Sequence, residues 1–193
     1  MPLPVTWIGR RLLQKEAGCD WDNSVLPVCI SRFALDERTP QADLYLSPNH
    51  ALFIDGMLIP AIHLVNGRSI VQTMPAGVKD IDYFHIRLAT HEVIFAEGTA
   101  VETLLFVNDR ETFVGFIRDH FDNVEEYTRL YGMDDGPSMT PCAPRVCYNG
   151  RRSELKALLR RMASPVIDIR DPIQIIHDRI AVRTEVRQSA DLC

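Results

Sequence analysis

Residues 46–60 read Leu-Ser-Pro-Asn-His-Ala-Leu-Phe-Ile-Asp-Gly-Met-Leu-Ile-Pro and carry the clearest structural signal in the chain. Two short apolar runs, 51–54 and 57–59, are separated only by Asp55-Gly56. Asp-Gly between apolar runs favours the positive φ angles of a two-residue hairpin turn. The stretch therefore predicts two antiparallel strands joined by a tight turn.

The sequence on both sides of this hairpin has the same character. From Val5 to about Phe106, short apolar or alternating runs are separated by turn residues, which is typical of β structure. Further strands are predicted at Val5-Ile8, Leu26-Phe33, Leu44-Leu46, Asp82-Leu88 and Glu92-Ala96. Residues 1–106 are accordingly predicted to form one all-β unit.

After Asn108 the pattern changes. Apolar residues recur at helical spacing through 111–132, and a second helix is predicted over 153–163, where Ser153 suits the N-cap. Three short apolar runs then predict small strands at 166–169, 173–176 and 180–182. Residues 107–193 are predicted to be an α+β appendage with two helices and short strands.

Composition excludes several classes of protein. The chain has 193 residues, is 46% hydrophobic and carries a formal charge of -5, which disfavours a broad cationic surface for nucleic acid or anionic lipid. No apolar run approaches the roughly 18 residues of a membrane-spanning helix. The first residues lack the features of a secretory signal, so the protein is taken as cytoplasmic by default.

No metal or cofactor is predicted. The six histidines form no His-Glu-x-x-His or other ligand frame, and Gly-rich phosphate loops and the Gly-x-Ser-x-Gly hydrolase turn are missing. Five cysteines, an odd number without dense spacing, are read as reduced thiols. Cys142 and Cys147 are either half of a zinc site or ordinary loop cysteines, and no second ligand pair lies nearby.

Ser47 and His50 stand just before the first strand of the hairpin, with the hydroxyl residue three positions ahead of the imidazole. Ser-Pro-Asn is ordinary turn chemistry, so these residues also fit a loop whose histidine is exposed or hydrogen-bonded. His85 has a similar alternative, because strand alternation places it on a polar face.

Four stretches of the chain, taken in order, favour a functional reading. They are Pro4-Val5-Thr6-Trp7-Ile8-Gly9-Arg10; Leu46-Ser47-Pro48-Asn49-His50-Ala51-Leu52-Phe53; Leu58-Ile59-Pro60-Ala61 leading to Leu64-Val65-Asn66-Gly67; and Tyr83-Phe84-His85-Ile86 through His91-Glu92-Val93-Ile94 to Ala96-Glu97-Gly98. Together they resemble the Hedgehog/intein, or Hint, domain family in its bacterial subgroup, over about the first 110 residues.

This resemblance implies a horseshoe-like β module that processes itself. In the family, a cysteine at the start of the domain attacks the preceding carbonyl and turns a peptide bond into a thioester, which another nucleophile resolves. A Thr or Ser and a His assist the bond exchange, and the matching residues here are Ser47 and His50. His91 matches the family's second histidine, and His85 lies near a position where splicing members carry Asp.

The chain departs from the family pattern at two places. The Cys-x-x-Gly-Thr opening, expected some thirty residues before Trp7, is absent, so the chain is expected to be N-terminally incomplete and unable to cleave itself. Val101-Glu102-Thr103 stands where splicing members have His-Asn, which disfavours splicing. An upstream segment or a partner protein is expected to complete the sheet.

Two other functions remain open from the sequence. The β unit is alternatively a non-catalytic interaction module that binds a partner at an exposed sheet edge. The third reading is an ordinary metal-dependent or hydrolytic enzyme that uses His50, His85 and His91.

Overall fold

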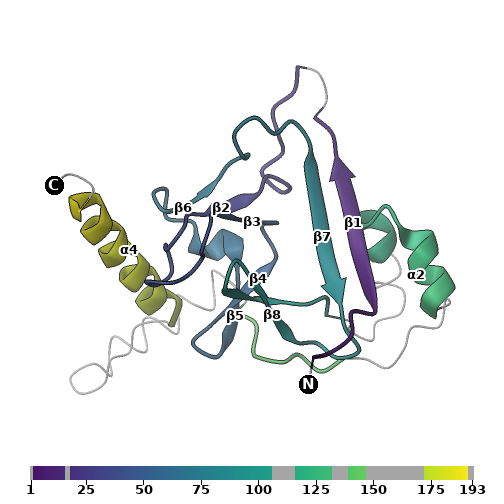
Figure 1. Ribbon diagram of the computed structural model, residues 1–193. Coiled ribbons are helices and arrows are strands. Elements are labelled where there is room, and N and C mark those ends of the chain that lie inside the picture. Colours follow the sequence, from purple (N-terminus) through teal and green to yellow (C-terminus); the bar gives the residue numbers. More distant parts are fainter. Residues whose placement is uncertain (1, 16–17, 106–115, 132–138, 147–171, 191–193) are drawn as a thin grey trace, which may run out of the picture.

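The computed structural model describes residues 2–15, 18–105, 116–131, 139–146 and 172–190 of the chain. Figure 1 shows a body of short strands, with a long two-stranded ribbon on one side and the C-terminal helix on the other. The described residues form nine strands and few helices, so the predicted mainly β fold is confirmed. None of the described helices is long and apolar enough to cross a membrane.

The strands form three antiparallel sheets. The ribbon pairs β1 (Trp7–Leu13) with β7 (Ile81–Arg87) along their full length. A three-stranded sheet has the order β3 (Leu44–Leu46), β2 (Val28–Ile30) and β6 (Ile70–Gln72). A four-stranded sheet has the order β5 (Met57–Pro60), β4 (Ala51–Ile54), β9 (Thr99–Glu102) and β8 (Val93–Ala96), and the 3-10 helix η1 (Ala61–Leu64) follows β5 directly.

The predicted hairpin is confirmed as β4 and β5. Ile54 pairs with Met57, and the two residues between them have φ angles of 51° (Asp55) and 80° (Gly56). Positive φ at both central positions is the turn geometry that Asp-Gly favours. Because the turn fixes the register of the hairpin, it also fixes the position of the loop that enters β4 and carries His50.

The strand predicted at Leu44-Leu46 is confirmed with the same ends, and the other strands predicted before residue 97 are present with shifted ends. The strand predicted at Val5-Ile8 is found as β1 and continues to Leu13, and the one predicted over Leu26-Phe33 shortens to β2. Phe33 has a φ of 59°, which takes the chain out of the extended conformation. β6 and β9 were not predicted, because their short apolar runs become strands only through pairing with β2, β4 and β8.

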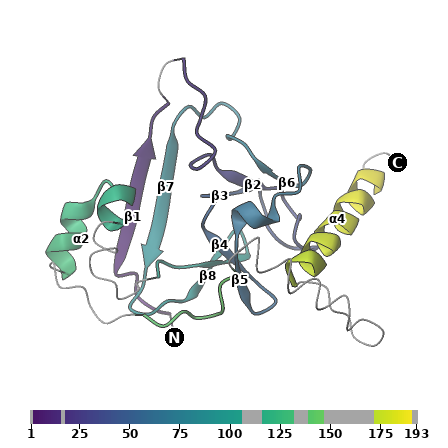
Figure 2. The same cartoon turned by 180° about the vertical axis from the view of Figure 1, so that it is seen from behind.

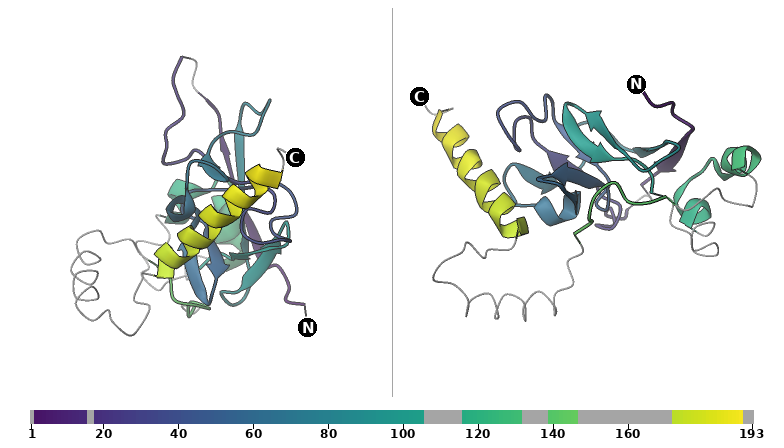
Figure 3. Two further views of the ribbon diagram at one scale, coloured as in Figure 1. Left: turned by 90° about the vertical axis from the view of Figure 1, so that its left-hand side faces the viewer. Right: turned by 90° about the horizontal axis from the view of Figure 1, so that it is seen from below.

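The main core is built from the three- and four-stranded sheets together with helix α4 (Pro172–Ala190). Figure 3 shows α4 lying across one side of these sheets. Ile176 and Ile180 project from α4 into the core and are almost completely buried. Burying an aliphatic side chain of this size stabilises the fold by about 1.5–3 kcal/mol. The division of the chain at residue 106 stays a prediction.

The strands predicted at 173–176 and 180–182 are wrong, because both segments lie within α4. Ile176, Ile180 and Thr184 are buried at intervals of four residues, which is the spacing of one helical face. Two short apolar runs concealed this period in the sequence. The predicted helix at 153–163 and the predicted strand at 166–169 lie outside the described residues.

The single helix predicted over 111–132 is also wrong in part. Residues 116–120 are helical, the chain leaves the helix at 121–123, and α2 (Val124–Tyr131) then begins. Both helical pieces lie beside β1, at the end of the molecule opposite α4 (Figure 2).

The interruption at 121–123 has a physical cause, since two residues in it bind the outer edge of β1. Asn123 accepts a hydrogen bond from Arg10 N (3.0 Å) and donates one to Ile8 O (2.9 Å). Asp122 donates from its backbone to Arg10 O (2.8 Å) and accepts from Leu12 N (2.6 Å) through its carboxylate. An edge strand that would otherwise expose its polar groups is therefore covered by this turn.

Candidate active site

Three of the histidines identified in the sequence lie together where β4 begins and β9 ends. His50 closes the loop before β4, His85 lies within β7, and His91 lies in the loop before β8. Glu102, the last residue of β9, contacts both His50 and His91. The site is thus assembled from four segments that are distant in sequence.

The loop before β4 fixes the orientation of His50. The His50 N–H donates to Ser47 O (3.0 Å), and Ala61 N donates to His50 O (2.9 Å). Ring atom Nε2 lies 3.0 Å from Glu102 O, and because a carbonyl only accepts, the neutral ring carries its proton on Nε2 and a lone pair on Nδ1. Neither His50 Nδ1 nor the Ser47 hydroxyl has a hydrogen-bond partner among the described residues.

His50 and His85 stack on each other. Their ring centroids are 4.7 Å apart and their planes differ by 26°. Burial lowers the pKa of His50, and burial together with the neighbouring His50 lowers the pKa of His85 to about 3. Both rings are therefore neutral near pH 7, since a cation on either ring would be poorly hydrated and would lie against its neighbour.

A glycine on the neighbouring strand makes the surroundings of His85 possible. Gly9 pairs with His85 across the ribbon, and a Cβ there would stand 2.5 Å from the ring of Phe121. Phe121 consequently passes over Gly9 and meets the His85 ring edge-on, with centroids 6.4 Å apart. His85 Nε2 is buried and has no hydrogen-bond partner among the described residues.

Glu102 supplies the negative charge of the site. Its side chain is only 4% exposed, and its carboxylate accepts hydrogen bonds from Ala51 N (2.9 Å) and from Arg145 Nη1 (2.8 and 2.9 Å to the two oxygens). Burial by itself raises the pKa of this carboxyl, but the His91 side chain, Arg145 and the Ala51 N–H outweigh it and hold the pKa below its ordinary value.

His91 links this carboxylate to the 139–146 stretch. Its ring atom Nδ1 accepts a hydrogen bond from Cys142 N (3.0 Å), which leaves the proton of the neutral ring on Nε2. Nε2 stands 3.7 Å from Glu102 Oε2, a distance at which the two attract electrostatically without forming a hydrogen bond. The side chain of His91 is completely buried.

The structure brings the four residues predicted from the sequence, Ser47, His50, His85 and His91, into one region. Sequence analysis missed Glu102 and Arg145 as members of this region. A signal for Glu102 existed, because it occupies the place of the His-Asn pair that the family resemblance led us to expect. Arg145 had no signal, since its contact spans 43 residues.

The remaining histidines lie elsewhere. His120 bonds Phe116 O in its own helical turn, and His177 of α4 bonds His63 O. Among the described residues no group of three His, Cys, Asp or Glu side chains is arranged to hold a metal ion. Cys142 lies beside His91, and Cys147 lies outside the described residues.

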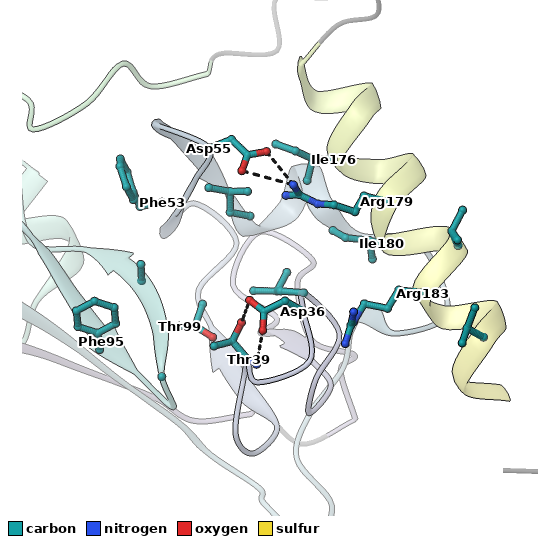
Figure 4. Close-up of a pocket in the computed structure, with 16 residues that line it drawn as sticks. Asp36, Thr39, Phe53, Asp55, Phe95, Thr99, Ile176, Arg179, Ile180 and Arg183 are labelled. Carbon is teal, nitrogen blue, oxygen red and sulfur yellow. Dashed lines mark hydrogen bonds and ion pairs between the residues drawn. The ribbon is translucent and has the colours of Figure 1, made fainter. Parts of the chain in front are cut away.

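A separate cavity of about 640 Å³ lies between α4 and the sheets. Its walls are mostly apolar and include Phe53, Phe95 and Ile180, with Arg179 bound to Asp55 at one end (Figure 4). None of its lining residues is a histidine, so the cavity is distinct from the site around Glu102.

The arrangement around Glu102 can donate and accept protons at a backbone amide. An unpartnered hydroxyl, a neutral imidazole with an open Nδ1 and a second histidine beside a carboxylate are groups that suit such an exchange.

The protein-family model for the Hint domain matches residues 1–108, which is more than half of the 193 residues. No curated protein and no solved structure matches the chain.

Proposed function

The chain belongs to the Hint domain family, and we propose that its histidine site assists an N–S acyl shift at a backbone amide. In such a shift a cysteine thiol forms a bond to the carbonyl carbon of the residue before it, while the bond from that carbon to the amide nitrogen breaks. The thiol proton must reach the departing nitrogen. A neutral imidazole near both atoms can accept this proton and then deliver it.

The orientation of His50 is the observation on which this proposal rests. Glu102 O holds Nε2, so Nδ1 is the atom left to face a substrate amide. Because burial lowers the pKa of His50, the ring starts neutral and its protonated form gives the proton up readily. The Ser47 hydroxyl, three residues earlier on the same turn, is available to bind the peptide unit under attack.

His91 and His85 are assigned supporting parts. His91 is placed between Glu102 and Cys142 N, so it holds the end of β9 that carries the acceptor of His50. His85 stacks on His50 and limits the positions that the His50 ring can take. Neither role requires these two histidines to exchange protons with the substrate.

We further propose that the 193 residues do not cleave themselves. They contain no Cys-x-x-Gly-Thr sequence. Burial raises the pKa of Cys29, and burial with the nearby Glu92 and Glu102 raises the pKa of Cys142, so neither forms the reactive thiolate easily.

A gain-of-cleavage experiment tests this function. The full chain extended at its N-terminus by a tag, followed by a segment of roughly thirty residues that opens with Cys-x-x-Gly-Thr, should release the tag by cleavage before that Cys when dithiothreitol is added. His50→Ala should abolish cleavage, whereas His120→Ala, which changes an exposed histidine, should not. Intact mass spectrometry follows the products. Cleavage that persists in His50→Ala contradicts the role of His50, and a shortened product from the unextended 193 residues contradicts their inactivity.

A non-catalytic interaction module is the second candidate, and β8 favours it. This strand lies at the edge of the four-stranded sheet, and Phe95 on it is 76% exposed. The edge of β1, in contrast, is covered by Asp122 and Asn123. If the extended chain stays intact while hydrogen exchange shows protection of β8 amides on adding an extended peptide, this second function is supported.

A further inference from the structure

Residues 142–146, which we call the 142–146 segment, lie along the outer edge of β5. Leu58 N donates to Pro144 O and Val146 N donates to Leu58 O, both at 2.9 Å, so Arg145 pairs with Leu58 in parallel orientation. In Figure 1 this stretch, drawn in green, passes below β5. The pairing uses the backbone alone and leaves every side chain of the segment available for other contacts.

The Arg145 side chain reaches from β5 over β4 to β9. It donates through Nη1 to both oxygens of Glu102, and through Nη2 to Asn49 O. Ala51, the first residue of β4, is fully buried, has only a methyl group and donates its N–H to the same carboxylate (2.9 Å). A guanidinium bound to a carboxylate and a carbonyl is a specific contact, because its fixed donors match both acceptors in geometry and charge.

A second side-chain contact is small and apolar. Ala143 is buried against Ala51 and Leu58, while Cys142 and Pro144 beside it are exposed. Pro144 fits this edge without loss, since the pairing uses its carbonyl and not the N–H that proline lacks. At the start of the segment, Cys142 N donates to His91 Nδ1.

These contacts are those of an extended peptide added to a sheet edge, with two side-chain subsites. We propose that the outer edge of β5, the surface of Ala51 and the carboxylate of Glu102 form a binding site for an extended peptide that carries an arginine two residues after a small residue. The 142–146 segment fills this site as a ligand supplied by the same chain. The site exists whether or not His50 acts in catalysis.

A free peptide competes poorly with an attached one, because attachment gives an effective concentration on the order of millimolar. The attached ligand must therefore be weakened. The test uses the full chain with Arg145→Ala and a fluorescein-labelled peptide of residues 139–146 in which Cys142 is replaced by Ser. Arg68→Ala, which removes an arginine from an exposed pair with Glu185, is the matched control.

Fluorescence anisotropy should show the peptide binding Arg145→Ala at least about tenfold more tightly than the wild type or Arg68→Ala. Changing the arginine of the peptide to alanine, or adding Glu102→Gln to the Arg145→Ala protein, should each weaken binding by about tenfold or more. The proposal is overturned if Arg145→Ala and the wild type bind the peptide with equal affinity, or if changing the arginine of the peptide to alanine leaves the affinity unchanged.

A measurement on the wild type protects the test against loss of folding in Arg145→Ala. Val146 N is bonded to Leu58 O, so its hydrogen exchange reports whether the 142–146 segment is in place. Excess arginine peptide at millimolar concentration should accelerate exchange at Val146, and the alanine peptide should not. If Arg145→Ala does not fold, hydrogen exchange at Val146 in the wild type becomes the test. An exchange rate that the arginine peptide leaves unchanged overturns the proposal. Neither readout involves cleavage, so failure here is distinct from failure of the acyl-shift function.

Discussion

Helix α4 and the 142–146 segment both come from the C-terminal part of the chain, yet different forces hold them against the sheets. α4 inserts Ile176 and Ile180 into the main core, where both are almost fully buried. The 142–146 segment fully buries only Ala143, packs a half-buried Val146 against the core, and otherwise depends on backbone hydrogen bonds and the ion pair between Arg145 and Glu102. Apolar burial depends little on salt or pH, whereas charged contacts depend on both. The contact of α4 is therefore suited to permanent structure, whereas the contact of the 142–146 segment is suited to replacement by another peptide.

Removing an apolar anchor of α4 should have the largest effect on stability. Ile180→Ala deletes buried methyl groups and leaves a cavity, which costs about 2–5 kcal/mol. Val182→Ala on the same helix is the control, because Val182 is 62% exposed and its truncation should change stability by less than about 0.5 kcal/mol. Urea denaturation measures both. Equal effects of the two substitutions would show that α4 is not anchored by its buried face.

Removing the charged anchor of the 142–146 segment should cost less. Arg145→Ala leaves the buried Glu102 carboxylate with fewer donors, at a cost of about 1–3 kcal/mol. Arg179→Ala is the matched control, because its ion pair with Asp55 is about half exposed and exposed pairs contribute about 0–1 kcal/mol.

A double variant distinguishes loss of the Arg145–Glu102 ion pair from loss of packing by the Arg145 side chain. Glu102→Gln combined with Arg145→Gln removes both charges and should recover most of the stability lost in Arg145→Ala, since no unpaired charge stays buried. If the double variant is as unstable as Arg145→Ala, the stability is lost through packing, and the 142–146 segment is then held by packing, as α4 is.

Much of the β architecture and of the histidine site followed from local sequence. Asp55-Gly56 specified the hairpin, and the resemblance around Ser47, His50 and His91 identified residues that the structure places together. The contacts with Glu102 and Arg145 did not follow, because an ion pair between residues 43 apart depends on how distant segments fold together.

The errors in the C-terminal part have the same origin. A helix with the buried residues Ile176, Ile180 and Thr184 resembles two short strands when each apolar run is considered alone. The helix predicted over 111–132 is interrupted because Asp122 and Asn123 bind β1, more than a hundred residues earlier. The spacing of apolar residues within 111–132 does not reveal a hydrogen-bonding partner so distant in the sequence.

Acid should weaken the β4–β9 side of the molecule through the stacked histidines. Burial and the neighbouring His50 lower the pKa of His85 to about 3. Below pH 6.5, His85 therefore binds a proton in the unfolded chain, whereas in the folded chain it stays neutral until the pH nears 3. Stability from this group is complete above pH 6.5 and is lost progressively as the pH falls from 6.5 toward 3. His50, whose pKa is also lowered, adds to the loss in the same direction.

Replacing His85 with a ring that cannot ionise isolates this contribution. His85→Phe keeps an aromatic ring against His50 and Phe121. The slope of unfolding free energy against pH, between pH 6.5 and 4, should become smaller by an amount that corresponds to close to one bound proton. Thermal melting across this range measures the slope, with His120→Ala as the control at an exposed histidine. A slope that is unchanged in His85→Phe would place the acid sensitivity elsewhere.

Salt should produce the smallest effect and should separate the two C-terminal contacts most directly. Raising NaCl from 0.05 to 0.5 M screens charges that reach solvent, and the Arg145 side chain is 34% exposed while Glu102 is not. We expect the docking of the 142–146 segment to weaken by less than about 1 kcal/mol, because screening acts on only one end of the ion pair. Hydrogen exchange at Val146 should therefore accelerate with salt, while exchange at Ile180 in α4 should not. In Arg145→Ala the salt dependence at Val146 should disappear, and if it persists, the charge that holds the segment is not the one at Glu102.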